Sequence, residues 1–553
     1  MCFLMEIDLY ICIRENTEIC SQMKRISILV SVLSILICLS SCHRTQNAEG
    51  LYVLPHNLTA EAFPAHVEFN WNSSQGAEFD LYLKSGKKFE MLSTVSTSPY
   101  LDWSLDESDN SRARTYYMLP HGVNPRSLKK DELARVKVDV QVPERSDEAL
   151  LDLTQRYTTR YFAQFSDAIS GMARERSNST NGNPVTTGGT GFGIMALIAG
   201  IERGYISQEE GFEIFDKILD FLDSVERFHG AWAHWYEPDT RTVHHFSKYD
   251  DGADLVETAF LVQGLITLRQ YAKFIRPDMS VRIERLVRGV EWDWFTKDGS
   301  EENLYWHWSK NYGWKMNHRI KGFDETLITY VLAAASKTHP IKAEVYEKCY
   351  KNSDYYYNGK SYFGIELPLG MEYGGPLFFT HYSWLGLNPK GLTDGKVDYF
   401  ERNRAHALIH YKYAVENPKQ HKGFGPDLWG FTSSDDMMVG YTSHHPGTDA
   451  ENGTVSPTAA ISSIVYTPEE SLQCLRHLYY DLGETVFGPM GFYDSYNPSL
   501  VEGQQVVKSY LAIDQGPIAV MIENYRSSLL WDLFMSAPEI QTGLEALGFT
   551  YKK

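Results

Sequence analysis

Three short stretches of the sequence place carboxylates where they could act as acids or bases. The first is 248–260, in which Asp250, Asp254 and Glu257 fall at positions i, i+4 and i+7. If a helix begins by Asp250, this spacing puts the three acids on one face. Acids also favour helix N-termini, so Asp250 could be a simple cap, whereas Glu257 lies too deep for that role. The stretch therefore predicts an acidic stripe at the start of a helix.

The second stretch is 320–330, where Asp324 and Glu325 immediately precede a run of Leu, Ile, Val and Ala. A carboxylate beside such an apolar helix has a raised pKa, as a general acid requires. An N-cap with a first-turn acid is the structural alternative, and it explains Asp324 better than Glu325. Glu325 is therefore the stronger candidate for chemistry.

The third stretch is 512–525, with Asp514 expected in a turn before Gly-Pro and Glu523 expected inside an apolar helix. An acid embedded among Ile, Ala, Val and Met needs a partner or a function. A structural ion pair with Arg526 or a neighbouring helix accounts for Glu523 as well as ligand binding does.

Paired carboxylates and exposed aromatic rings are the combination that hydrolysis of a glycosidic bond requires. One acid protonates the departing oxygen while the other activates water, and sugar rings stack on aromatic faces. Phe, Trp and Tyr make up 13% of the chain, more than a core of this size usually needs. Several of these rings lie in long loops and are candidate sugar contacts: Trp235, Trp306 and Trp314.

Other chemistries lack their usual motifs. Gly-x-Ser-x-Gly, His-Glu-x-x-His and Gly-x-x-x-x-Gly-Lys-Ser/Thr are absent, which argues against esterases, zinc proteases and P-loop enzymes. The net charge of -19 is opposite in sign to the basic surface that nucleic acids attract. The glycine run at 188–193 has no strand-and-helix parallel unit around it, so a close backbone approach at the start of a helix explains it better than a nucleotide does.

No metal site or cofactor is expected. The histidines at 307, 318, 381, 444 and 445 lack ligand spacing, although His444-His445 in a Gly/Ser/Asp loop could hold a cation. The two cysteines expected in the folded body are Cys349 and Cys474, and both are predicted to be buried thiols.

The N-terminal region has the pattern of an export signal. An apolar stretch at 26–39 follows two basic residues and leads into Leu-Ser-Ser-Cys, which ends at Cys42 and resembles a bacterial lipobox. We therefore expect translation to start at Met23, residues 1–42 to hold an over-long start and the signal, and lipid on Cys42 to anchor the chain facing the periplasm, on the outer membrane. A transmembrane anchor is the alternative, but fourteen residues fall short of the roughly 20 that cross a bilayer.

Two patterns of hydrophobicity divide the rest of the chain. Residues 51–141 alternate with period two and predict a small β-sandwich, in which Trp71 and Tyr116-Tyr117 resemble fibronectin type III modules. From 146 to 553 the period changes to 3.6. The expected helices are about 147–166, 192–203, 208–227, 253–274, 279–292, 325–337, 342–350, 400–415, 457–464, 468–482, 517–533 and 538–547.

Twelve helices joined by aromatic and acidic loops fit an (α/α)6 toroid, with six inner helices, six outer helices and a cleft at one end. A stacked helical solenoid would show a repeat of fixed length, and the sequence has none. The fold class is therefore expected to be mainly α, with the toroid preceded by the small β-sandwich.

Residues from about 148 to 551 resemble the bacterial glucoamylase-like domain, and most closely glycoside hydrolase family 144, the β-1,2-glucanases of the (α/α)6 fold. The motifs that carry the resemblance are 188–193, Asp250 to Glu257, Gly322 to Tyr330, Tyr373 to Ser383, and Ile513 to Arg526.

The resemblance implies an anomer-inverting glycoside hydrolase without metal or organic cofactor. Glu325 would be the general acid, and Asp514 would be the base or would position the water, unless a relay uses Asp250 or Asp254 instead. The expected substrate is β-1,2-glucan or its oligosaccharides, with short products such as sophorose. Besides the tryptophans named above, the expected sugar-binding residues are Asp250, Asp254, Glu257, His381, Tyr382 and Glu523.

Three alternatives stay open at this point. The chain could be a glycan-binding lipoprotein without catalysis, a glucosidase of another linkage, or a polysaccharide lyase. The lyase is the weakest, because lyases usually hold uronate carboxylates with Arg and Lys, whereas these loops are acidic and aromatic. A monomer is expected, with no nucleic-acid partner.

Overall fold

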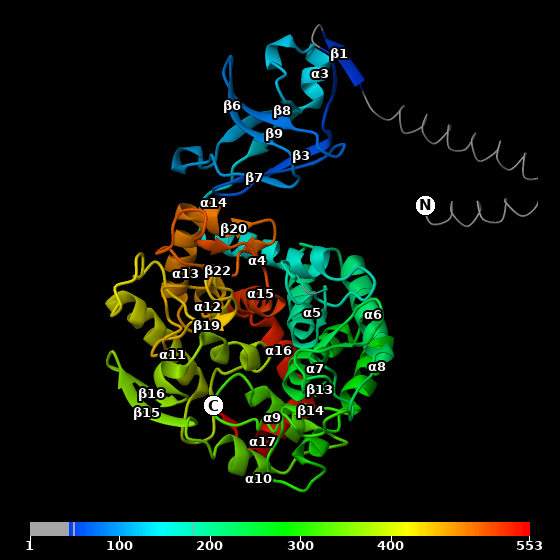
Figure 1. Ribbon diagram of the computed structural model, residues 1–553, viewed down its shortest axis with the longest axis vertical. Helices are drawn as coiled ribbons and strands as arrows, with labels where there is room; N and C mark the ends of the chain where they lie inside the picture. The colour runs from blue at the N-terminus through cyan, green and yellow to red at the C-terminus, as the bar shows by residue number, and fades with distance from the viewer. Residues whose placement is uncertain (1–43, 48–49, 181, 553) are drawn as a thin grey trace, which may run out of the picture. The chain divides into compact units, whose positions relative to one another are not determined.

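The computed structural model describes residues 44–47, 50–180 and 182–552. The chain divides into two compact units, Met1–Glu144 and Arg145–Lys553. In Figure 1 the strands of the first unit are blue to cyan, and the helices of the second run from α4 in cyan to α17 in red. The start codon, signal and lipobox predictions, including Cys42, fall outside the described residues. Within the described residues, no helix combines the length and the apolar character needed to cross a membrane.

Two antiparallel sheets form the first unit. One has the order β3-β4-β7 and the other the order β6-β5-β8-β9. The strands are β3 (His56–Ala62), β4 (Val67–Asn72), β5 (Phe79–Ser85), β6 (Lys88–Val95), β7 (Tyr100–Asp102), β8 (Ala113–Pro120) and β9 (Lys137–Gln141). A short hairpin of β1 (Arg44–Asn47) and β2 (Gly50–Val53) and the helix α3 (Lys130–Arg135) complete the unit.

Apolar side chains at alternate positions of the strands form the core of this unit. Val67, Phe69 and Trp71 of β4 are buried in one cluster with Leu81 of β5 and Tyr116 of β8. Because side chains of a strand point alternately to opposite faces, the two sheets share their apolar faces as a sandwich. The resemblance to fibronectin type III modules in particular stays a prediction.

Helices dominate the second unit, close to where the sequence predicts them. The longer ones are α4 (Asp147–Arg160), α5 (Thr187–Glu202), α6 (Gln208–Ser224), α7 (Leu255–Ala272), α8 (Pro277–Arg288), α9 (Leu327–Ala335), α11 (Tyr399–Glu416), α12 (Pro457–Ile461), α13 (Pro468–Arg476), α15 (Ala512–Arg526), α16 (Leu529–Met535) and α17 (Pro538–Ala546). Two short helices are α10 (Ala343–Val345) and α14 (Gly483–Val486). The predicted helix 517–533 is two helices, α15 and α16, because Ser528 adopts a left-handed backbone conformation with φ of 63°.

Five helices in succession form most of an inner ring: α9 packs on α7, α7 on α5, α5 on α15, and α15 on α12. Two 3-10 segments, Leu377–Thr380 and Tyr382–Trp384, occupy the sixth position. These two segments close the ring. On one side the Ser383 hydroxyl accepts a hydrogen bond from the Ile328 amide of α9, and on the other side His381 contacts Ser463, which follows α12. Helices such as α4, α8, α13 and α17 pack outside this ring, which confirms the (α/α)6 toroid.

Glycines set the distance between two inner helices. A Cβ on Gly191 of α5 would lie 2.2 Å from the carbonyl oxygen of Phe260, and one on Gly264 of α7 would lie 2.2 Å from the carbonyl oxygen of Gly191. Only glycine allows backbones to approach so closely. The close approach predicted for the glycine run at 188–193 is therefore confirmed, and Cys349 and Cys474 are buried free thiols as expected.

Candidate active site

The N-terminal ends of the inner helices carry the candidate acids. Asp254 is the N-cap of α7 and Glu257 lies in its first turn, Glu325 lies in the turn before α9, and Asp514 lies in the first turn of α15. The N-terminus of a helix carries a partial positive charge that favours anionic groups. The toroid thus gathers acids that are far apart in the sequence at one end of its ring.

Two details of this arrangement differ from the prediction. The helix α7 begins at Leu255 rather than by Asp250, because the Asp254 carboxylate accepts hydrogen bonds from the amides of Val256 and Glu257 and caps the helix there. Asp250 therefore lies in the preceding loop and not on a shared helix face. Asp514 was expected in a turn, and it lies inside the first turn of α15.

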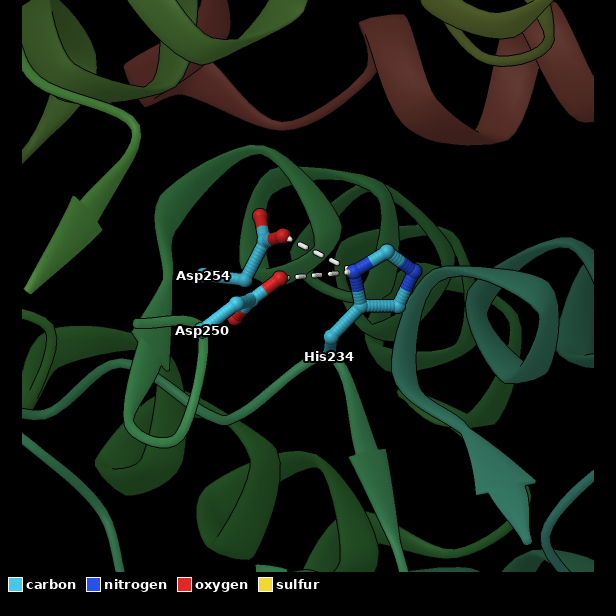
Figure 2. Close-up of side chains that lie close together, drawn as sticks. All are labelled: His234, Asp250 and Asp254. Atoms are coloured by element: carbon cyan, nitrogen blue, oxygen red, sulfur yellow. Dashed lines mark ion pairs between the residues drawn. The ribbon is translucent and has the colours of Figure 1, made fainter. Parts of the chain in front are cut away.

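Asp250 and Asp254 nevertheless lie close together, because His234 and His307 each contact both carboxylates. His234 Nδ1 lies 3.6 Å from Asp250 Oδ2 and 3.2 Å from Asp254 Oδ2, as drawn in Figure 2, and His307 Nε2 lies 3.4 Å from each of the same oxygens. Burial by itself raises the pKa of Asp254, but the two imidazoles outweigh it and hold the pKa below its ordinary value. Although burial lowers the pKa of His307, the two aspartates raise it to about 9.

Glu257 has a different environment from these two aspartates. Its carboxylate accepts a hydrogen bond from the Gly188 amide at 2.8 Å, at the start of α5, and lies 4.0 Å from His234 Nε2. Burial raises the pKa of Glu257 to about 7, with Asp254 adding to the effect. A carboxyl with this pKa exchanges protons near neutral pH.

Glu325 is half-buried, and its own backbone amide donates a hydrogen bond to its carboxyl; no ion pair or hydrogen bond from another side chain is found for this carboxyl among the described residues. Burial, and next the neighbouring Asp324, raise the pKa of Glu325 well above its ordinary value. The Ser383 hydroxyl donates to the Glu325 carbonyl and fixes the backbone of the turn. Asp324 instead accepts from the amide and hydroxyl of Thr326 in the turn before α9. It is not the N-cap that the structural alternative expected, because Thr326 occupies that position. Of the two acids, Glu325 is the one with a carboxyl available for proton transfer.

Asp514 faces a second buried carboxyl, Asp494. Their side chains are in hydrogen-bonding contact, yet Asp514 Oδ2 and Asp494 Oδ1 have no donor. The Asp435 amide donates to Asp494 Oδ2 at 2.5 Å, and Arg176 is paired with Asp435 at 2.8 Å. Burial raises the pKa of Asp494 to about 7, and burial together with Asp494 raises that of Asp514 well above its ordinary value. Two facing acceptors of this kind share one proton.

Tyr382 lies among all three groups of acids. Burial raises the pKa of its phenol, and the carboxylates of Asp514, Glu325 and Glu257 raise it further. These carboxylates come from the N-terminal ends of three inner helices, Glu325 from the turn before α9, and all lie near one phenol.

Aromatic rings flank the acids on one side. The indole of Trp306 stacks on His307 at 5.8 Å, and Trp235 contacts His234 edge-on at 5.2 Å; both indoles are half-buried. Trp314 instead packs against Trp294 of the 3-10 helix Trp292–Thr296 and against Tyr305. Trp235 and Trp306 are therefore better placed than Trp314 for a sugar contact.

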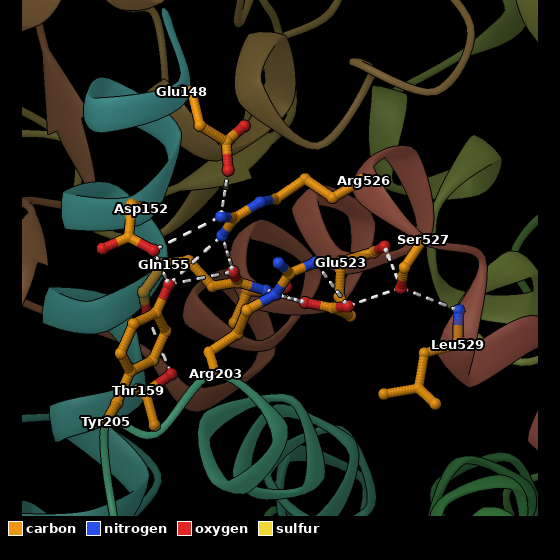
Figure 3. Close-up of polar contacts among 11 residues, drawn as sticks. Glu148, Asp152, Gln155, Thr159, Arg203, Tyr205, Glu523, Arg526, Ser527 and Leu529 are labelled. Atoms are coloured by element: carbon orange, nitrogen blue, oxygen red, sulfur yellow. Dashed lines mark hydrogen bonds and ion pairs between the residues drawn. The ribbon is translucent and has the colours of Figure 1, made fainter.

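Two of the expected sugar-binding residues lie elsewhere in the unit. His381 is 1% exposed, contacts Ser463, and has a pKa that burial lowers to about 3, so it is a neutral core residue. Glu523 forms a two-pronged ion pair with Arg203, at 2.8 and 2.9 Å (Figure 3). The structural alternative stated above for Glu523 is thus the one found, with Arg203 as partner in place of Arg526.

Several residues of the site were not among the predicted ones. His234 and Asp494 carry no motif, and they reach the acids through contacts between segments distant in the sequence. The nearest sequence signal for His234 was its loop of alternating aromatic and small residues, which was read only for its rings.

The comparisons with known proteins agree with this geometry. The Glycoamylase family model matches residues 317–538. A characterised protein of Parabacteroides distasonis, an exo β-1,2-glucooligosaccharide sophorohydrolase acting at the non-reducing end, is 36% identical over 516 residues, 88% of this chain and 70% of that protein. The chain belongs to the glucoamylase-like family of glycoside hydrolases. The resemblance stated from the motifs is thereby confirmed.

Solved structures of this glycoside hydrolase family show the same fold. The endo-β-1,2-glucanase of Chitinophaga pinensis, solved with sophorotriose and glucose, is 46% identical with a TM-score of 0.71 and covers 73% of this chain and 99% of its own. A β-1,2-glucanase of Parabacteroides distasonis is 34% identical with a TM-score of 0.78 and covers 89% of this chain and 72% of its own.

Proposed function

We propose that this glycoside hydrolase cleaves β-1,2-glucan or its oligosaccharides with inversion of the anomeric carbon, releasing short products such as sophorose. One observation carries the proposal: Glu325, with a raised pKa and no ion pair among the described residues, and Asp514, paired with Asp494, both lie close enough to Tyr382 to raise the pKa of its phenol. The linkage is supported by the relatives, which are named for β-1,2-linked substrates.

In the proposed reaction Glu325 is the general acid. Its raised pKa keeps the carboxyl protonated near neutral pH, and the proton passes to the glycosidic oxygen as the bond to the anomeric carbon breaks. A water attacks that carbon from the opposite face and gives its proton to the ionised member of the Asp514 and Asp494 pair. The two carboxyls share one proton beforehand, so one negative charge is available to accept it.

We also propose that the chain acts from chain ends, as its sophorohydrolase relative does. The match to that relative covers 88% of this chain, whereas the second unit alone is about three-quarters of it, so the match extends into the β-sandwich. The endo-acting relative covers 73%. A match to the exo-acting relative that extends beyond the helical unit supports exo action here.

The test is a panel of linear glucans with β-1,2, β-1,3, β-1,4 and β-1,6 linkages, digested by the purified chain. We expect sophorose from β-1,2-glucan alone, in the α-anomer when followed by proton NMR from the first minutes. Glu325→Gln should lower kcat by about 10²- to 10⁴-fold while oligosaccharide still binds. Glu344→Gln makes the same change on an exposed carboxyl and should leave kcat unchanged.

Each other outcome contradicts a stated part of the proposal. Near-normal turnover by Glu325→Gln rules out this residue as the acid. Binding of β-1,2-glucan without products by the wild-type chain favours the non-catalytic sugar-binding alternative, and products absorbing in the ultraviolet favour a lyase. A β-anomer as first product means retention rather than inversion.

Finally, we propose that the protein is an exported lipoprotein held on the periplasmic face of the outer membrane, and that it acts as a monomer. The basic, apolar and Leu-Ser-Ser-Cys pattern before Cys42 supports the anchor, and the presence of all the candidate acids in one chain supports the monomer. In cells, Cys42→Ser should move the protein from the membrane fraction to the soluble fraction. Membrane retention of this variant would contradict the lipid anchor.

A further inference from the structure

An open pocket of about 590 Å³ lies on the β-sandwich of the first unit. It is lined by side chains of β5 and β6 and by the loop that follows β8. Its volume falls within the range of about 300–1,000 Å³ that is typical of small-molecule sites. All of its lining residues belong to the first unit, so the pocket is separate from the acids of the toroid.

The alternation of β5 places this pocket on the sheet face away from the core. Leu81 and Leu83 belong to the buried core of the sandwich, so Asp80 and Tyr82 point to the opposite face. Tyr82 lies opposite Met91 of β6, whose side chain is 49% exposed. The solvated face of an antiparallel sheet is usually polar. Apolar side chains gathered in a pocket on such a face indicate a binding surface.

Tyr82 supplies an aromatic ring that is free for a ligand. The residue is half-buried, and neither a ring partner nor a hydrogen bond to its hydroxyl is found for it among the described residues. Phe89, which also lines the pocket, is instead packed edge-on against Tyr117 at 5.2 Å and has the Lys84 ammonium over its ring at 5.6 Å. A sugar stacks its C–H groups on an aromatic face and forms hydrogen bonds through its hydroxyls. Tyr82 offers both kinds of contact.

Asp80 orients a histidine at the edge of the pocket. The residue is 2% exposed, and its carboxylate accepts from the Thr94 hydroxyl at 2.8 Å, from His121 Nδ1 at 2.8 Å and from the Gly122 amide at 2.9 Å. The imidazole is thereby held through Nδ1, and no partner is found for Nε2 in the part of the chain that the structure describes. His121 therefore presents Nε2 to a ligand in a fixed orientation.

Asn124 and Arg126 add further hydrogen-bond donors. Asn124 Oδ1 accepts from the Arg126 amide at 3.0 Å, which orients the Asn124 side chain. Within residues 50–180, no partner is found for Asn124 Nδ2 or for the Arg126 guanidinium. The lining holds one carboxylate, Asp80, and one permanent cation, Arg126, so it suits an uncharged ligand better than an anion. A sugar unit combines an apolar face with uncharged hydroxyls and meets both requirements.

We propose that this pocket binds a glucosyl unit of the glucan as a second, non-catalytic site. Tyr82 stacks on the sugar ring, while His121, Asn124 and Arg126 bind its hydroxyls. The inference rests on the proposed function, because it takes the substrate of the second unit as the ligand. Both sites are in one chain, so a long glucan bound at the pocket is kept at a raised local concentration for cleavage. A short oligosaccharide occupies one site at a time and gains no such advantage.

Equilibrium dialysis of the full chain counts the sites. The probe is a radiolabelled β-1,2-linked glucotetraose with sulfur in place of each bridging oxygen, which resists hydrolysis. We expect two bound ligands per wild-type chain and one for Tyr82→Leu/Arg126→Met. Arg126→Met alone changes only an exposed side chain, and it should weaken the second site without a change in Tm. Arg112→Met removes an exposed guanidinium outside the pocket and should keep both sites.

The same count separates this proposal from the proposed function. If the toroid binds no glucan, the wild type should bind one ligand and the double variant none. Equal numbers of bound ligands in the wild type and the double variant would overturn the second site, whatever the hydrolytic activity. Loss of the same ligand in Arg112→Met would place the site elsewhere and would also overturn it.

Cleavage gives a second measurement. With long linear β-1,2-glucan, the KM of Tyr82→Leu/Arg126→Met should rise by about 2- to 10-fold at unchanged kcat, as expected from the loss of one aromatic contact. With the ordinary tetrasaccharide, both KM and kcat should equal those of the wild type. The same change in KM on both substrates would mean that the variant disturbs the active site, and it would contradict a separate site.

Discussion

Glu523→Gln separates a structural role of this residue from a sugar-binding one. The Glu523 side chain is 2% exposed and accepts from Arg203 Nε at 2.8 Å, Arg203 Nη2 at 2.9 Å, Gln155 at 2.9 Å and the Ser527 hydroxyl at 2.5 Å (Figure 3). Through these contacts α15 is joined to α5 and α4. The glutamine variant loses the charge and turns an N–H group toward one of the donors.

The expected loss is about 3 kcal/mol in the free energy of unfolding. Breaking a buried ion pair costs about 3–5 kcal/mol, and the lower end applies because Arg203 is 25% exposed and water can reach its guanidinium in the variant. Urea unfolding at pH 7 measures the difference. In a double-mutant cycle with Arg203→Met, the coupling energy should exceed about 1 kcal/mol.

The contribution of Glu523 to the free energy of unfolding should decrease as the pH falls. Burial tends to raise the pKa of Glu523, but Arg203, Ser527 and Gln155 outweigh it and hold the pKa below the ordinary value of 4.5. A carboxyl with a lowered pKa stabilises the folded state above the unfolded pKa and loses this effect as pH falls. The stability difference between wild type and Glu523→Gln should therefore be full at neutral pH and shrink below about pH 4.5.

Catalysis distinguishes the two roles. Glu523 lies nine residues after Asp514 on α15, about 13 Å along the helix axis, so KM and kcat at low temperature should change less than about twofold. A KM raised tenfold with unchanged stability would refute this reasoning and place Glu523 in a sugar subsite. Additivity of Arg203→Met and Glu523→Gln would refute the ion pair.

Three further predictions concern the ring and its acids. Asp494→Asn removes the charge that raises the pKa of Asp514, so the acid limb of the kcat/KM profile should move to lower pH; an unmoved limb would show that Asp514 titrates independently. Gly191→Ala places a methyl group against the Phe260 carbonyl and pushes α5 away from α7, so the free energy of unfolding in urea should fall by about 1–3 kcal/mol. An unchanged urea midpoint would show that the two helices can move apart without loss of stability. Trp306→Ala should raise KM for oligosaccharides more than it lowers kcat, and an equal effect on both would contradict a stacking contact.

Local patterns predicted the helices well because apolar periodicity is a property of neighbouring residues. The first helix of the toroid begins at Asp147 as expected, with the Ser146 hydroxyl accepting from the Ala149 amide. Glu325 was also identified from local features, an acid beside an apolar helix that a cap does not explain. These inferences needed no knowledge of distant contacts.

The remainder of the site depends on contacts between distant segments. Asp250 was placed on a helix face by its spacing, but the pairing of Asp254 with His307, more than fifty residues away, ends the helix at its cap. Likewise, the contact of Asp494 with Asp514 requires closure of the ring, and no local pattern marks Asp494. The spacing of carboxylates showed which chemistry to expect, but only tertiary contacts showed which groups assist them.

The order in which α15 enters the ring has a consequence for biosynthesis. This helix lies between α12 and α5 and is among the last elements to be made (Figure 1). Until α15 has packed in place, α5 presents uncovered apolar surface, and exposed surface of this kind favours aggregation. A chain that ends before α15 lacks both Asp514 and the helix that covers α5, so we expect it to aggregate and not to form a partly active hydrolase.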